Sequence, residues 1–192
     1  MFKTGHIPAH AGKITTTDPI RGDDIKSIRN VLTKPRDIAL WSVGTNCALR
    51  AGDLLSLKWD DTTDDGERIT IVVKESKTQK LRRIVLNAMA SADLRTWRRE
   101  SNSEFCFSGQ RGQLTVAALG RMIKHWAALA NVDAKRVSSH SLRKTWCRAM
   151  VEQFDEPLYR MMWALGHSSE RQTAQYIGLL TDEVAGLYQH IV

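Results

Sequence analysis

Hydrophobic residues recur at helical spacing along most of the chain, which predicts a largely helical protein. Between residues 25 and 32 the apolar positions follow Asp23 and Asp24 directly, so an amphipathic helix begins with an acidic first turn. Pro35 ends this helix and suits the first turn of the next one, which is expected over about 35–46. Further helices are predicted over 50–57, 88–100, 115–130, 139–153, 157–165, 170–178 and 181–190.

The period changes to that of β-strands in two neighbouring stretches. Residues 68–74 alternate and are rich in β-branched side chains, and residues 81–86 form a second short run of this kind. The polar residues 75–80 between them predict an antiparallel hairpin with a basic tip. Residues 59–62 are a candidate third strand, and 102–113 are predicted to be a loop. The predicted fold class is therefore α+β and mostly helical, with a small antiparallel β-sheet of two or three strands packed on a helical bundle.

The length of 192 residues indicates one domain with a short arm. Residues 1–22 contain several glycines and prolines and little periodicity, so they are predicted to be an irregular N-terminal arm. Residues 23–192 are then the domain itself. Hydrophobic residues make up 42% of the chain, which is enough for a packed core and excludes wholesale disorder.

Composition and charge narrow the class of protein further. No apolar run approaches the ~18 residues that a membrane span needs, and the first residues lack the apolar stretch of a secretion signal. The three cysteines are widely spaced, which suggests reduced thiols. Lys and Arg (28) exceed Asp and Glu (21), and the net charge of +7 favours a polyanionic partner. We therefore expect a cytoplasmic protein with no membrane association.

Several residues that could carry chemistry have ordinary explanations when each is considered alone. Arg50 and Asp53 are three positions apart and could form a surface ion pair worth roughly a few tenths of a kcal/mol. His140 and Arg143 share one helical face, as solvated polar residues often do. Tyr176 could be a half-buried core tyrosine. The order and the sequences of the motifs around these residues say more about function than any single position does.

Three short motifs together resemble one known family. Residues 48–59, Ala-Leu-Arg-Ala-Gly-Asp-Leu-Leu-Ser-Leu-Lys-Trp, resemble the first catalytic-arginine motif of the tyrosine recombinases, the phage integrase family. Residues 139–145, Ser-His-Ser-Leu-Arg-Lys-Thr, resemble that family's His-x-x-Arg motif. Residues 165–169, Leu-Gly-His-Ser-Ser, are followed nine residues after His167 by Tyr176, and this is similar to the family's closing motif. Three motifs in the family's order are far more specific than one.

The resemblance implies a site-specific DNA recombinase of the integrase or invertase type. Such an enzyme cuts and rejoins duplex DNA through a 3′-phosphotyrosyl intermediate, and a lysine of the hairpin protonates the departing 5′-hydroxyl. One phosphodiester is exchanged for another, so the resemblance implies no ATP, no metal and no other cofactor. The implied catalytic residues are Arg50, Lys77, His140, Arg143, His167 and Tyr176.

The chemistry of such an exchange suits these residue types. A phosphodiester is anionic, so its cleavage without a metal needs fixed positive charges around the non-bridging oxygens. Guanidinium groups such as those of Arg50 and Arg143 stay charged and donate in a planar fork that matches phosphate. Imidazole groups can move protons near neutral pH. Nearby cations can also stabilise the phenolate of a tyrosine, which is otherwise a poor nucleophile at pH 7.

The basic hairpin offers three lysines for the role of proton donor. Lys77 lies in Ser-Lys-Thr, a sequence similar to that of the family's hairpin. From the tip of the turn its flexible side chain can bring the ammonium toward DNA. Lys74 and Lys80 are the alternatives. Asp53 matches an acidic position of the family and is expected to hold Arg50 or a neighbour in place without chemistry of its own. The expected DNA-backbone contacts are Lys74, Lys80, Arg82, Arg83 and Lys144.

Other aromatic residues fit the chemistry less well. Tyr159 precedes the Leu-Gly-His motif, and Tyr188 lies far beyond His167, so neither has the spacing of the nucleophile. Four tryptophans lie in apolar helical patterns and are expected to pack in the core: Trp41, Trp126, Trp146 and Trp163.

Assembly and completeness are further expectations from the resemblance. The predicted helix 181–190 is expected to dock on a neighbouring protomer, which implies a tetramer on DNA, although packing within its own chain is comparably consistent. Accessory DNA-bending proteins and association with the nucleoid are also expected. Only 49 residues precede Arg50, where most family members carry a separate core-binding domain. The chain is therefore expected to be either a fragment or a short recombinase without that domain.

Two other functions remain as alternatives on the same fold. A type IB topoisomerase-like enzyme would use the same chemistry to relax DNA without exchanging strands between sites. A non-catalytic DNA-binding regulator would keep the fold and lose the chemistry. The complete set of catalytic residue types argues against the regulator, because a protein without catalysis has no need of all six.

Overall fold

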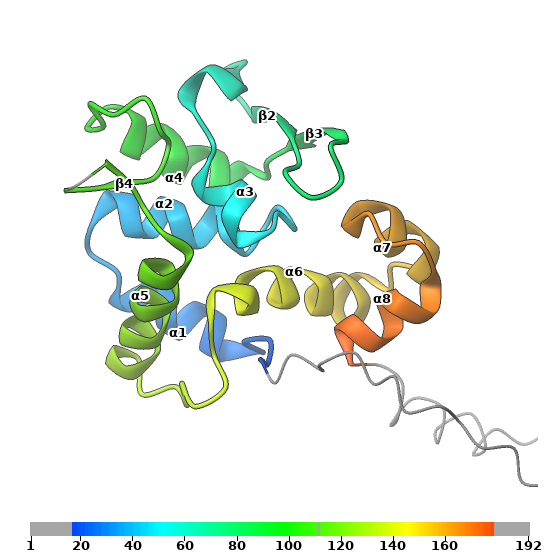
Figure 1. Cartoon of the computed structure of the whole chain (residues 1–192). Coiled ribbons are helices and arrows are strands. Elements are labelled where there is room, and N and C mark those ends of the chain that lie inside the picture. Colours follow the sequence, from blue (N-terminus) through cyan, green and yellow to red (C-terminus); the bar gives the residue numbers. More distant parts are fainter. Residues whose placement is uncertain (1–16, 111, 179–192) are drawn as a thin grey trace, which may run out of the picture.

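The computed structural model describes residues 17–110 and 112–178 (Figure 1). This part of the chain confirms the predicted α+β, mostly helical class. Its α-helices are α1 (Asp23–Val31), α2 (Pro35–Gly44), α3 (Ala51–Leu55), α4 (Ala88–Arg98), α5 (Val116–Leu129), α6 (Ser139–Phe154), α7 (Leu158–Leu165) and α8 (Glu170–Ile177). No helix among the described residues is both long and apolar enough to cross a membrane. The predicted helix 181–190 lies outside the described residues.

A three-stranded antiparallel sheet has the order β1–β2–β3. Its strands are β1 (Thr62–Asp64), β2 (Ile69–Lys74) and β3 (Leu81–Val85). Lys74 pairs with Leu81 at one end of the ladder, which confirms the predicted hairpin with residues 75–80 as its turn. The third strand begins at Thr62, later than predicted, because Trp59–Asp61 form a 3-10 turn.

Residues 102–113, which were predicted to be a loop, contain a minimal hairpin. Its strands are β4 (Ser108–Gly109) and β5 (Gly112–Gln113), which pair antiparallel. The loop prediction is wrong for these four residues because strands of two residues show no alternation pattern.

The main hydrophobic core is formed by α1 to α5 and the inner face of β2. Each of these elements contributes side chains that are fully or almost fully buried, and burial of one such side chain contributes roughly 1.5–3 kcal/mol. The most central of them are Ile28, Leu40, Leu54, Ile71, Leu94 and Ile123.

The tryptophans divide between the core and the surface. Trp41 and Trp126 are buried and pack edge to face with ring centroids 6.2 Å apart, as predicted. Trp146 is half-buried on α6. Trp163 is 78% exposed, so the prediction of core packing is wrong for this residue. It lies on α7 beside a cavity between this helix and the β2–β3 hairpin, where its ring stays open to solvent.

A smaller hydrophobic cluster joins α6, α7 and α8. Cys147 of α6, Met161 and Leu165 of α7 and Ile177 of α8 are buried in it, and Tyr176 packs against them. Figure 1 shows α6 running from the larger helical body to the α7–α8 pair, which lies below the β2–β3 hairpin. The three motifs, far apart in sequence, therefore lie on elements that meet at this end of the molecule.

Residues 17–22, the described part of the predicted arm, form no helix or strand and lie along the start of α6. The Ile20 N–H donates to Thr145 Oγ1 at 2.9 Å, and Lys144 Nζ donates to the Thr17 carbonyl at 2.8 Å. The backbone of this segment therefore holds two consecutive side chains of α6. Residues 1–16 of the predicted arm lie outside the described residues.

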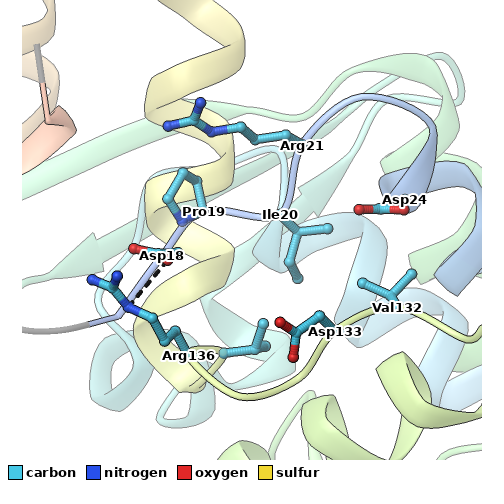
Figure 2. Close-up of a pocket in the computed structure, with 9 residues that line it drawn as sticks. Asp18, Pro19, Ile20, Arg21, Asp24, Val132, Asp133 and Arg136 are labelled. Atoms are coloured by element: carbon cyan, nitrogen blue, oxygen red, sulfur yellow. Dashed lines mark ion pairs between the residues drawn. The ribbon is translucent and has the colours of Figure 1, made fainter. Parts of the chain in front are cut away.

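A cavity of about 340 Å³ lies between the same segment and residues 132–137 (Figure 2). The ion pair of Asp18 with Arg136, at 3.2 Å, borders it. None of its lining residues belongs to the three motifs, so this cavity is separate from the candidate active site.

Candidate active site

The first motif places a guanidinium and a buried carboxylate at the start of a short helix. Arg50 is the N-cap residue of α3, and it follows Ala48, whose φ of 54° lies in the left-handed region that non-glycine residues adopt at a cost. Asp53 is 1% exposed, and its Oδ1 accepts a hydrogen bond from the Ser76 N–H at 2.9 Å. Arg50 Nη1 lies 3.9 Å from Asp53 Oδ2. Because Asp53 is buried, the two residues do not form a surface ion pair, and Asp53 instead ties α3 to the hairpin turn.

Glu75 is a second buried carboxylate of the site and is not among the residues predicted from the motifs. It follows β2 directly and continues the run of alternate buried positions in that strand. Its carboxylate forms ion pairs with Arg50 Nη1 at 3.1 Å and with Arg82 Nη1 at 2.8 Å. Burial alone would raise the pKa of Glu75, but the hydroxyl of Thr78 and the two guanidinium groups outweigh it and lower the pKa to about 2. An ionisable residue at an inward strand position is the signal that could have revealed it.

Lys77 is exposed in the turn between β2 and β3, with Lys74 and Lys80 exposed on either side of it. The turn faces the loop after α7: a Cβ added to Gly166 would lie 3.6 Å from Glu75 Oε2. A cavity of about 390 Å³ opens between the hairpin and α7, and His167 is among its lining residues. The hairpin therefore brings its lysines to the closing motif.

Arg143 lies in the first turns of α6 and is 4% exposed. Its Nη2 donates to the Leu165 carbonyl at 2.7 Å, and its guanidinium carbon lies 5.9 Å from the centroid of the Tyr176 ring. Its Nη1 is buried and has no hydrogen-bond partner among the described residues. A buried charged donor without a partner is costly, and a site that receives an anion explains it.

His167 follows Gly166, which ends α7 with φ of 65°. Its Nδ1 lies 3.1 Å from Thr173 Oγ1, and that hydroxyl donates to the Ser169 carbonyl. Since the hydroxyl proton is used on Ser169, we assign the proton of the neutral imidazole to Nδ1, which leaves the Nε2 lone pair free. Burial, followed by the charges of Arg143, Arg50 and Lys77, lowers the pKa of His167 to about 4.

Tyr176 lies in the last turn of α8 and is half-buried. Its ring packs edge to face with the His167 ring at a centroid distance of 5.4 Å, and Lys144 Nζ lies 5.3 Å from its centroid. Burial, together with the thiol of Cys147, raises the pKa of Tyr176 to about 12, although Arg143 and Arg50 oppose the shift. At neutral pH the phenol is therefore protonated.

Five of the six predicted catalytic residues lie close together. Arg143 and His167 contact the Tyr176 ring, and the charges of Arg50 and Lys77 are close enough to lower the pKa of His167. The sixth, His140, is exposed in the first turn of α6, and among the described residues it has no hydrogen bond or ring contact with the other five. It lies one helical turn before Arg143, on the same face of α6.

Some of the side chains predicted to contact the DNA backbone are exposed, and others are bonded within the protein. Lys74, Lys80 and Arg83 are exposed on the hairpin. Arg82 is half-buried and its guanidinium is engaged by Glu75, and Lys144 donates to the Thr17 carbonyl. Of the rival tyrosines, Tyr159 is 52% exposed on α7, and Tyr188 lies outside the described residues.

The arrangement provides what transfer of a phosphoryl group needs. Two guanidinium groups and an ammonium can surround an anion, a neutral imidazole can accept a proton, and a phenol stands beside them. No group of three or more His, Cys, Asp or Glu side chains that could hold a metal ion occurs within residues 17–110 and 112–178.

Comparisons with known proteins agree with this geometry. Residues 19–183 match the sequence profile of the phage integrase family. The probable integrase/recombinase YoeC of Bacillus subtilis (strain 168) is 25% identical over 177 residues, which cover 89% of this chain and 94% of YoeC.

Solved structures share the fold. The XerH site-specific recombinase bound to a palindromic difH substrate, in a post-cleavage complex, superposes with a TM-score of 0.74 and 21% identity over 95% of this chain and 56% of XerH. A lambda integrase tetramer bound to a Holliday junction superposes with a TM-score of 0.69 and 18% identity over 91% of this chain and 52% of that chain. The chain thus spans about half the length of these two solved proteins.

The fold and the cluster of Arg50, Arg143, His167 and Tyr176 define a catalytic domain of the tyrosine recombinase type. With the profile matching 19–183, the chain belongs to the phage integrase family. The resemblance noted in the three motifs is therefore confirmed.

Proposed function

We propose that this protein is a site-specific DNA recombinase that cuts and rejoins duplex DNA through a 3′-phosphotyrosyl intermediate. The observation that carries the proposal is the meeting of Arg143 and His167 at the Tyr176 ring, with Arg143 Nη1 buried and unpaired among the described residues. The DNA-bound structures of XerH and lambda integrase, which share this fold, support DNA as the partner. Residues 23–192 are the proposed catalytic domain.

Arg50 and Arg143 hold the scissile phosphate in this proposal. Arg143 offers its free Nη1 to a non-bridging oxygen, and burial in the site strengthens that charged hydrogen bond. Arg50 is 24% exposed and its Nη1 is paired with Glu75, which leaves its other donors for the phosphate. His140, at the exposed start of α6, adds a hydrogen bond to the phosphate from the DNA side.

Tyr176 is the nucleophile, and its proton leaves as the bond to phosphorus forms. The phenol oxygen attacks phosphorus, the bond from phosphorus to the 5′-oxygen breaks, and that oxygen takes a proton from the Lys77 ammonium. The free Nε2 lone pair of His167 is suited to accept the phenol proton, because its Nδ1 proton is held by Thr173. Attack by a 5′-hydroxyl on the phosphotyrosyl bond reverses the step and joins the new strand.

Incubation with a nicked suicide duplex tests the proposal. In buffer with EDTA, the wild-type chain should form a covalent DNA adduct that is visible on a denaturing gel, and Tyr176→Phe should form none while still binding the duplex, because only the attacking oxygen is removed. Tyr159→Phe is the matched control and should form the adduct normally. An adduct that persists in Tyr176→Phe would contradict the assignment of the nucleophile. Exchange between two linear duplexes carrying marked sites distinguishes recombination from DNA relaxation.

Assembly as a tetramer on DNA through the C-terminal helix is part of the same proposal. Exposed apolar side chains on the end of α6 and on α7 support a surface that receives a neighbouring copy: Phe154, Tyr159 and Trp163. The lambda integrase tetramer bound to a Holliday junction, which shares the fold, supports self-association. Accessory DNA-bending proteins and association with the nucleoid complete the proposed set of partners and location.

A further inference from the structure

Glu75 is a buried acidic residue in a site that must attract an anion. It is 1% exposed, and a carboxylate is normally buried only when it is paired. Its negative charge opposes phosphate binding by simple electrostatics, so its presence in the site requires another explanation. Its contacts supply one.

The Glu75 carboxylate contacts both Arg50 and the turn that carries Lys77. Oε2 lies 3.1 Å from Arg50 Nη1 and accepts a hydrogen bond from the Thr78 hydroxyl at 2.7 Å. Oε1 accepts from Arg82 Nη1 at 2.8 Å. One carboxylate oxygen thus contacts the guanidinium proposed to hold the phosphate and the residue that follows Lys77.

The backbone of Glu75 also closes the turn that carries Lys77. Its N–H donates to the Lys80 carbonyl at 3.0 Å, and its carbonyl accepts from the Gln79 N–H at 2.9 Å. Lys77 lies at the exposed centre of that turn. The two backbone bonds would form with any residue at position 75, so the Glu75 side chain acts on the turn through its contact with the Thr78 hydroxyl, next to Lys77.

We infer that Glu75 is a positioning residue that fixes the Arg50 guanidinium and the Lys77 turn in one relative arrangement. The inference rests on the proposed function and deepens it, since phosphate holding and leaving-group protonation must occur on the same phosphate. The charges of Arg50 and Arg82 balance the carboxylates of Glu75 and Asp53. The positive charge that the pocket offers to DNA therefore comes from Arg143 and Lys77.

Single-turnover cleavage of the nicked suicide duplex by the full chain tests this inference. Glu75→Gln keeps the shape of the side chain but cannot accept from both guanidinium groups, so cleavage should slow by about ten- to hundred-fold, as expected when catalytic groups are misplaced by about 1 Å. DNA affinity should be unchanged or higher, because a negative charge has been removed. Glu67→Gln, which removes an exposed carboxylate from the β1–β2 turn, is the matched control and should cleave at the wild-type rate.

A substrate with sulfur in place of the 5′-bridging oxygen separates the effect of Glu75 on Lys77 from its effect on Arg50. A thiolate leaves without a proton, because a thiol is far more acidic than an alcohol. Lys77→Ala should therefore recover the wild-type rate on this substrate. Glu75→Gln should recover only in part, since sulfur replaces the action of Lys77 and leaves the displaced Arg50 uncorrected. Complete recovery, or none, would overturn the inference that Glu75 positions both groups.

Two further measurements keep the outcomes distinct. Circular dichroism and urea unfolding show whether Glu75→Gln is folded. If it is not, Thr78→Val removes the hydroxyl that donates to Glu75 and accepts the longer bond from the Lys80 N–H. This variant should slow cleavage of the oxygen substrate, and the sulfur substrate should restore the rate. A folded Glu75→Gln that cleaves at the wild-type rate overturns the inference and leaves the proposed function intact. If the wild-type chain itself forms no adduct, the proposed function fails.

Discussion

The fold holds Arg143 charged, with one donor unpaired in the described part of the chain, and holds His167 neutral, and both states are suited to binding and cleaving a phosphodiester. The Arg143 guanidinium is 4% exposed and leaves one donor unpaired among the described residues, and burial lowers its pKa without removing its charge at neutral pH. His167 is kept neutral beside it. Such unsatisfied groups reduce the stability of a fold, and they are typical of sites organised for a ligand.

The neutral state of His167 predicts a measurable dependence of stability on pH. Its pKa is about 4 in the folded protein and near ~6.5 in an unfolded chain, so between these values the unfolded state binds more protons. The free energy of unfolding should therefore fall as pH drops from about 6.5 toward 4. Urea unfolding at pH 7 and pH 4.5 should show a larger loss for wild type than for His167→Gln. Equal losses in the two proteins would contradict the lowered pKa.

At the scale of elements, the segment of residues 17–20 fixes the helix that carries Arg143. Thr145 is 2% exposed, and its hydroxyl accepts the backbone N–H of Ile20. Thr145→Val leaves that buried N–H without an acceptor and should lower the free energy of unfolding by about 1–3 kcal/mol. Faster amide hydrogen exchange at Ile20 would locate the effect.

Thr96→Val is the control for this change. The Thr96 hydroxyl is exposed and bonds only to the Ala92 carbonyl of its own helix, so its loss should alter stability by no more than about 0.5 kcal/mol. If both variants lose the same amount, the contact between the segment and α6 contributes nothing specific.

The helices and the main hairpin could be predicted from the sequence because each carries a periodic pattern and a marked end. α2 begins at Pro35 as predicted, and α5 follows the cap residue Thr115. The pattern fails where an element is too short to repeat, as in β4 and β5. It also failed at Trp163, because an apolar residue at helical spacing does not reveal whether another element covers it.

The site was predictable only as far as its motifs. The three motifs contain four residues that the fold brings together: Arg50, Arg143, His167 and Tyr176. Glu75 lies outside the motifs, and a charged residue beside a turn is usually solvated. Its place in the alternation of buried positions 69, 71 and 73 is the sign that it points inward. The pKa values of His167 and Tyr176 were not predictable, since they depend on burial created by packing of α6, α7 and α8.

At the scale of the whole molecule, the net charge of +7 and the exposed cations of the hairpin predict salt-sensitive DNA binding. If about four phosphates are contacted, affinity for a duplex should fall on the order of a hundred-fold between 50 and 200 mM salt. Fluorescence anisotropy across this range measures the slope of log affinity against log salt. Lys74→Gln should reduce that slope by about one. A slope near zero would mean that the basic surface does not contact DNA.

The raised pKa of Tyr176 has a consequence for when the phenol can react. Burial disfavours the phenolate, so at neutral pH the side chain rests as the protonated phenol, which is the weaker nucleophile. The charges of Arg143 and Arg50 act in the opposite direction. Attack by this oxygen therefore requires that its proton be taken up as the new bond forms, so the buried phenol reacts only where a proton acceptor and an electrophile are held together.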